Sequence, residues 1–134
     1  MTVLRVINTS VLVAYACFLV SLSVFKTAEM FLPHIYALES WLGGDKLMHL
    51  KLSFGLSLLA LMTFVQAKAI VKRLFQSIMV CFILVSGLFA DEFHQALVST
   101  RRFEWLDLSY GVTGIFMGLL LFIFASMVLN KIQK

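Results

Sequence analysis

The sequence predicts an all-α membrane protein, a four-transmembrane-helix bundle with a short interfacial amphipathic helix between the first and second spans. Composition is the first reason: 61% of the 134 residues are hydrophobic and the mean hydropathy is strongly positive, whereas about half of the residues of a soluble domain are apolar. Length is the second, because four apolar stretches approach the roughly 20 residues that a helix needs to cross a bilayer. We therefore expect residues 1–134 to form a single membrane domain without an attached soluble domain.

The four expected spans cover about 6–25, 47–65, 74–90 and 106–129. For the first stretch a cleaved signal peptide is the alternative, because Arg5 precedes it. Its apolar part is longer than the roughly 7–15 residues of a signal-peptide core, so a span is favoured.

The segment from residue 26 to residue 44 is expected to hold the short helix. Pro33 is suited to a first helical turn, and Ile35, Leu38 and Trp41 recur at helical spacing, while Gly43 and Gly44 follow as a stop signal. A segment that is amphipathic and carries aromatic residues is typical of the membrane interface. A partly disordered loop is disfavoured, because it would leave many large apolar side chains in water.

Ionisable residues gather next to the spans, in residues 45–51 and 91–107. Charged groups at a membrane boundary are costly unless they pair, meet water or have a function, so these stretches are the candidate site. In an antiparallel bundle of four spans, both stretches lie at the same membrane face and can converge on one pocket.

Four spans also place both termini on one side of the membrane. That side carries six basic residues and no acidic ones: Arg5, Lys68, Lys72, Arg73, Lys131 and Lys134. The other side carries five basic residues, Lys26, Lys46, Lys51, Arg101 and Arg102, together with all seven acids. The basic counts are nearly level, but most of the basic residues on the second side belong to the candidate site. We therefore expect cytoplasmic termini and an outward-facing site.

Three basic residues of this site, Lys46, Arg101 and Arg102, can recognise an anionic group such as a phosphate or carboxylate. The alternative is that they form ion pairs with acids such as Glu92 and Asp107, or contact lipid headgroups.

Carboxylates and imidazoles in the same stretches allow general acid–base chemistry or metal binding at Asp45, His49, Glu92 and His94. The alternative is a polar network that ties the helix ends together, with helix caps at Asp45 and Asp107.

Small residues recur on the fourth span, where Gly111, Gly114 and Gly118 share a face with Asp107. Glycines at this spacing allow close approach of a neighbouring helix. This spacing also leaves a homo-oligomer open.

The ordered set Asp45-Lys46-x-x-His49, Glu92-x-x-Gln95, Arg101, Asp107 and Gly114 resembles the VanZ-like family of small bacterial membrane proteins. That family is named for a member linked to glycopeptide (teicoplanin) resistance. Two positions depart from its pattern: Gly111 stands where the family usually has Asn, and Leu97 where it has an aromatic residue. Losing the amide removes a polar group from the expected pocket.

The resemblance implies a multi-pass protein of the bacterial cytoplasmic (inner) membrane. Our expected ligand-binding residues are Asp45, Lys46, His49, Glu92, Gln95, Arg101 and Asp107. We expect this pocket to bind membrane lipids, either an anionic lipid or a lipid-linked cell-envelope precursor, and to influence glycopeptide susceptibility. The alternative is a membrane-embedded enzyme acting on a lipid-linked substrate, with acid–base catalysis by Glu92 and His49.

The sequence identifies no cofactor and no specific metal site. Nucleic-acid binding is disfavoured, because the net charge of +4 is spread over two membrane faces.

Overall fold

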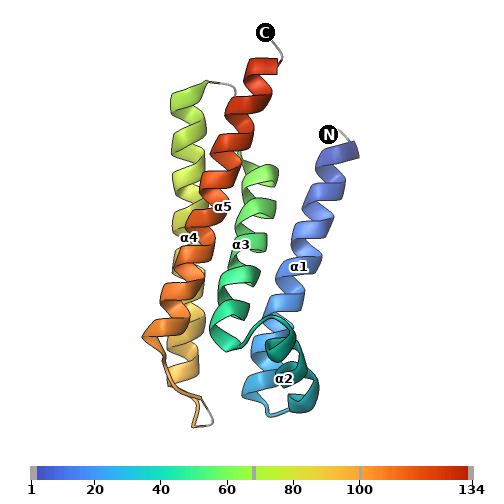
Figure 1. The fold of residues 1–134 in the computed structure, drawn as a ribbon, viewed down its shortest axis with the longest axis vertical. Helices are drawn as coiled ribbons and strands as arrows, with labels where there is room; N and C mark the ends of the chain where they lie inside the picture. Colours follow the sequence, from blue (N-terminus) through green and yellow to red (C-terminus); the bar gives the residue numbers. More distant parts are fainter. Residues whose placement is uncertain (1–2, 68, 100, 133–134) are drawn as a thin grey trace.

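A computed structural model of the chain describes residues 3–67, 69–99 and 101–132, and within them all regular structure is helical (Figure 1). The helices are α1 (Val3–Thr27), α2 (Leu32–Trp41), α3 (Asp45–Phe64), α4 (Ile70–Ala96) and α5 (Trp105–Ile132). All except α2 are long and apolar enough to cross a membrane. The predicted all-helical architecture with four such helices is therefore confirmed.

Each long helix begins before its predicted span, and all except α3 also end after it, with the largest difference at α4. The prediction ended this span at residue 90, but the helix continues to Ala96 and includes Asp91, Glu92 and Gln95. Glu92 and Gln95 are buried against the rest of the bundle. Because the backbone N–H and C=O groups of a helix bond to one another, the chain can stay helical where it carries polar side chains into the bundle.

The most extensive packing in the bundle joins α3 and α5. A Cβ atom added to Gly114 would clash with the backbone carbonyl of Leu50, and one added to Gly118 would lie 2.8 Å from Oγ of Ser57. The same serine donates a hydrogen bond of 3.0 Å to the carbonyl of Ile115. The predicted role of the glycines is thus observed inside one chain, and any association of copies would need another surface.

The other two long helices lie on opposite sides of α3, as Figure 1 shows. Helix α1 packs on α3 and α2, whereas α4 packs on α5 and α3. A small core is formed by residues of the four long helices and by the residue that follows α3: Leu12, Ala60, Leu61, Val65, Val80, Cys81 and Ile115. Large apolar side chains such as Phe82, Leu120 and Phe124 are more than 60% exposed, which suits surroundings of hydrocarbon.

The short helix between the first two spans is present as α2, with Pro33 in its first turn. It ends where predicted, because Gly43 and Gly44 adopt positive φ angles of 95° and 101°, a conformation that glycine adopts without steric cost. Its predicted apolar face is divided, since Ile35 is buried and Trp41 is 80% exposed.

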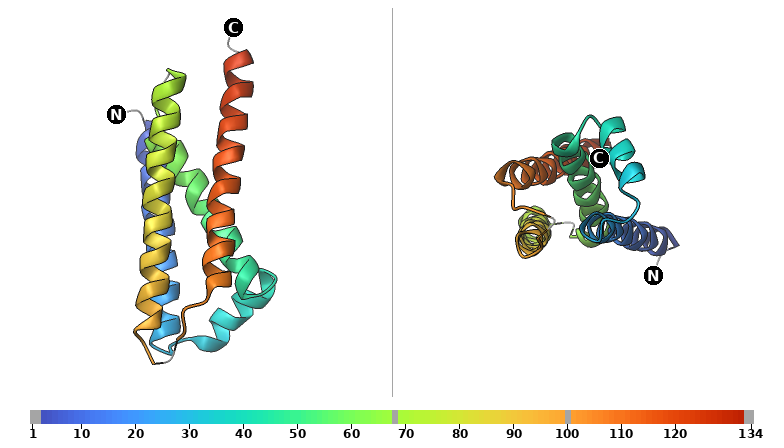
Figure 2. Two further views of the ribbon diagram at one scale, coloured as in Figure 1. Left: turned by 90° about the vertical axis from the view of Figure 1, so that its left-hand side faces the viewer. Right: turned by 90° about the horizontal axis from the view of Figure 1, so that it is seen from below.

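The first residues of α1 and the last residues of α5 lie at the same end of the bundle (Figures 1 and 2). Helix α2 and the connection from α4 to α5 lie at the other end, called here the polar end. Two residues of the charge argument, Lys68 and Lys134, lie outside the described residues, as does the side chain of Lys131.

Candidate functional site

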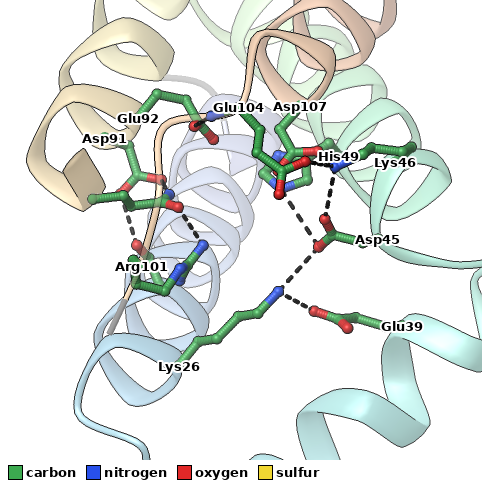
Figure 3. A network of polar contacts seen from close by, with 12 residues as sticks. Lys26, Glu39, Asp45, Lys46, His49, Asp91, Glu92, Arg101, Glu104 and Asp107 are labelled. Atoms are coloured by element: carbon green, nitrogen blue, oxygen red, sulfur yellow. Dashed lines mark hydrogen bonds and ion pairs between the residues drawn. The ribbon is translucent and has the colours of Figure 1, made fainter. Parts of the chain in front are cut away.

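All seven expected binding residues lie at the polar end, and Figure 3 labels all of them except Gln95. They come from the start of α3, the end of α4, the connection after it and the start of α5: Asp45, Lys46 and His49; Glu92 and Gln95; Arg101; and Asp107. The structure divides them into two groups with different partners. One group surrounds Lys46 and the other surrounds Arg101.

Three carboxylates surround the ammonium group of Lys46. It donates hydrogen bonds to Asp107 and Glu104 and lies 3.3 Å from Oδ2 of Asp45. Asp107 is 5% exposed, so its charge is almost fully removed from water. Lys46 therefore takes part in the ion pairing that was the alternative to anion recognition.

A second lysine extends this network to the first two helices. Lys26, at the end of α1, bonds to Glu39 of α2 and lies 3.0 Å from Oδ1 of Asp45. Sequence reasoning left Lys26 and Glu39 out of the site. The available signal was that Lys26 ends the first span at the same membrane face as Asp45.

His49 lies between the carboxylates of this network. Its Nε2 atom is 3.9 Å from Oδ1 of Asp45 and 3.9 Å from Oδ2 of Asp107, and the three residues offer ligand atoms within 4.8 Å of one another. This set suits a divalent cation, but Lys46 already contacts both carboxylates. A metal ion would have to compete with that ammonium group.

The helix cap at Asp45, which was part of the alternative interpretation, does not form, because the start of α3 has no side-chain cap and Asp45 makes ion pairs instead. His34 and His94 are exposed. Of the two histidines considered for proton transfer, His49 and not His94 therefore joins the network.

A chain of hydrogen bonds forms the second group and connects α1 with α4. Ser23 donates to Oδ1 of Asp91 over 2.7 Å, and Gln95 donates to Oδ2 of the same carboxylate over 2.8 Å. Arg101 in turn donates to the side-chain oxygen of Gln95. Asp91 belongs to the candidate stretch 91–107 and shares a helical face with Gln95, but it was not among the expected binding residues. Ser23 was missing from the expected site altogether.

One nitrogen of the Arg101 guanidinium group makes no hydrogen bond to the described residues. This atom, Nη1, is buried. A buried guanidinium nitrogen without a partner is costly, so this atom is a candidate contact for an anionic ligand.

Glu92 is completely buried, and one oxygen accepts a long hydrogen bond of 3.4 Å from the backbone amide of Glu104. Its other oxygen has no partner within the described part of the chain. Glu92 lines neither of the two cavities described below. It is therefore close to the pocket but separated from its open space.

Two cavities meet at the polar end. The polar cavity, of about 310 Å³, is lined by Lys26, Arg101 and Arg102, by Glu29 and Tyr36, and by carboxylates of the Lys46 network. The apolar cavity, of about 410 Å³, extends between α1, α3 and α4. Lys26 and Arg101 line both cavities. A molecule with a charged head and an apolar chain would find both kinds of surface here.

The two departures from the family pattern also have structural settings. A Cβ atom at Gly111 would lie 2.6 Å from Leu88 and 3.3 Å from Oγ of Ser53. An asparagine would thus require Leu88 to move, so the glycine permits tight packing of α5 on α4. Leu97 is 72% exposed and lines neither cavity.

Comparisons of the chain with protein-family models, with curated proteins and with solved structures give no match.

Proposed function

We propose that this chain is a VanZ-like protein of the bacterial cytoplasmic membrane whose outward-facing pocket binds an anionic lipid or a lipid-linked cell-envelope precursor. Through this binding it influences susceptibility to glycopeptide antibiotics. The observation that carries the binding proposal is Arg101, which lines both cavities and has a buried nitrogen without a partner among the described residues. A phosphate oxygen would satisfy that nitrogen with a charge-assisted hydrogen bond.

The family proposal is supported by the order and spacing of the motif residues, from Asp45 to Gly114. Gly114 allows α5 to approach α3 closely, and Asp107 lies about two helical turns before it in α5. The motif therefore combines a packing residue with the polar groups that this packing brings together.

For the membrane placement, we propose that both termini are cytoplasmic and that α2 lies in the outer interface. Arg5, Lys72 and Arg73 lie at the end of the bundle that would be cytoplasmic. On α2, Tyr36 and Trp41 are both more than half exposed. Exposed aromatic side chains of this kind are enriched at headgroup depth.

Binding is better supported than the catalytic alternative. Glu92 lines neither cavity, and a general acid or base must come within hydrogen-bond reach of its substrate. His49 lines the apolar cavity, but its Nε2 atom lies 3.9 Å from a carboxylate oxygen of Asp45 and 3.9 Å from one of Asp107. These positions favour a structural role in the network.

The test is native mass spectrometry of detergent-purified protein with added phosphatidylglycerol. We expect Arg101→Ala to lower lipid retention by about tenfold or more, since a hydrogen bond to a charged group contributes about 1.5–3 kcal/mol. Lys51→Ala is the matched control. It removes one positive charge near the same end, but Lys51 lines neither cavity and donates to the backbone of Leu42.

Equal retention by wild type and Arg101→Ala would refute the binding proposal. The same pair of variants tests the cellular role. Glycopeptide susceptibility of cells expressing the protein should change with Arg101→Ala and stay unchanged with Lys51→Ala, provided that both variants reach the membrane in equal amounts.

A further inference from the structure

We infer that the apolar cavity between α1, α3 and α4 holds one acyl chain of a membrane phospholipid, which enters sideways from the bilayer between α1 and α4. This inference rests on the proposed function, because the phosphate of the same lipid would bind at Arg101. It adds where the hydrocarbon chain lies and how the chain reaches its site.

The lining of the cavity changes along its length. Apolar side chains from three helices surround most of it, including Leu19, Leu56 and Leu84. Most of its polar side chains belong to the polar end: Ser23, Lys26, His49, Asp91, Gln95 and Arg101. Ser53 lies about one helical turn deeper on α3. The volume of about 410 Å³ is within the usual range of roughly 300–1,000 Å³ for small-molecule sites. A phospholipid has the same sequence of chemistry, from an apolar chain to a charged head.

The helices leave a side of this cavity open. Helices α1 and α4 lie on opposite sides of α3, and each packs on α3 in preference to the other. Val20 of α1 and Ile83 of α4 both line the cavity, yet they are 63% and 67% exposed. Because both residues belong to apolar helices that can span a membrane, the opening would face hydrocarbon.

A contact between α1 and α4 marks the polar limit of this opening. The hydrogen bond from Ser23 to Asp91 joins the two helices there, and Arg101 lies beside it through Gln95. A lipid whose acyl chain enters on the side of this hydrogen bond away from the polar end brings its phosphate to the level of Arg101. The charge of the head and the unpartnered nitrogen of Arg101 are complementary.

Gly87 provides a direct test, because it lines the cavity and an added Cβ atom would meet nothing within 4 Å. Gly87→Phe should fill the space without touching the charged network. Ala16→Phe approaches from the opposite wall, on α1. Ser86→Phe is the control, since Ser86 is exposed on α4 and lies outside the cavity lining.

The measurement is native mass spectrometry with delipidated protein and dioleoyl phosphatidylglycerol. We expect Gly87→Phe and Ala16→Phe to lower retention by about tenfold or more, because methylene groups of the chain lose their buried site. Ser86→Phe should retain the lipid as wild type does. Wild-type retention in both cavity variants, with loss in Arg101→Ala, would overturn the acyl-chain site and leave the proposed function standing. Wild-type retention in Arg101→Ala as well would overturn both.

Photo-crosslinking of the wild-type protein gives a readout that does not depend on how the variants fold. The probe is phosphatidylglycerol with a diazirine near the middle of one acyl chain. Crosslinks to cavity residues of α1 and α4, such as Leu19 and Leu84, support the site. Crosslinks confined to outward side chains such as Phe82 and Leu120 would overturn it.

Discussion

Lys46 in the first turn of α3 donates a hydrogen bond to the buried carboxylate of Asp107 in the first turn of α5. The two residues are 61 positions apart in the chain. Their pairing compensates a carboxylate that is only 5% exposed. It also ties together the polar ends of the two helices that pack most closely elsewhere. Lys46 is thus occupied by its ion pairs within the protein, whereas Nη1 of Arg101 is available to bind a ligand.

Replacing Lys46 by Met should destabilise the protein. The change leaves the buried carboxylate of Asp107 without its partner. Because the Lys46 side chain is 30% exposed, the expected cost is about 1–3 kcal/mol, below that of a fully buried ion pair. Thermal unfolding in detergent would show a lower midpoint than for Lys72→Met, an exposed lysine at the other end of the bundle. The double variant Lys46→Met, Asp107→Leu should recover much of the lost stability. Equal midpoints for Lys46→Met and Lys72→Met would contradict the prediction.

The close approach of α3 and α5 predicts that Gly114→Ala is destabilising. The new methyl group would clash with the backbone at Leu50, which cannot rotate away as a side chain can, and overpacking of this kind costs about 1–3 kcal/mol. Unfolding by a denaturing detergent measures the effect. Gly87→Ala is the matched control, because the space beside Gly87 is open, and a Gly114→Ala variant as stable as this control would show that the helices can separate at little cost.

Restoring the family residue at position 111 gives a prediction about coupling between α4 and α5. Gly111→Asn should lower stability, because the new side chain would meet Leu88 at 2.6 Å. Adding Leu88→Ala should offset part of this loss by making room. A double-variant cycle of melting temperatures checks the coupling, and additive effects of the two changes would argue against direct contact.

The proposed orientation can be tested by cysteine labelling in intact cells. In a variant with Cys17 and Cys81 replaced by serine, a cysteine at Ser99 should react with a membrane-impermeant maleimide. A cysteine at Lys72 should react only after the cells are broken. Both positions are exposed and lie at opposite ends of the bundle, so the reverse labelling pattern would place the polar end in the cytoplasm.

Much of the candidate site was predictable, because helical spacing and an even number of spans bring polar helix ends to one face. This reasoning grouped residues as distant as Asp45 and Asp107 correctly. It missed Ser23, whose role depends on the carboxylate of Asp91 lying opposite it on another helix. Small hydroxyl residues are common near the ends of apolar helices, so the sequence offered no distinguishing signal.

The sequence by itself determined the class of the protein, the number of long helices and the end of the bundle at which the ionisable residues gather. These features depend on local composition and on the length that a bilayer imposes. Tertiary structure decided which charges are paired. Close approach at Gly114 sets the position of α5 against α3 and brings Asp107 to Lys46, while the separation of α1 from α4 leaves the cavity beside Arg101. Partner choice depends on ångström-scale distances between helices, and those distances arise only when all the packed surfaces meet.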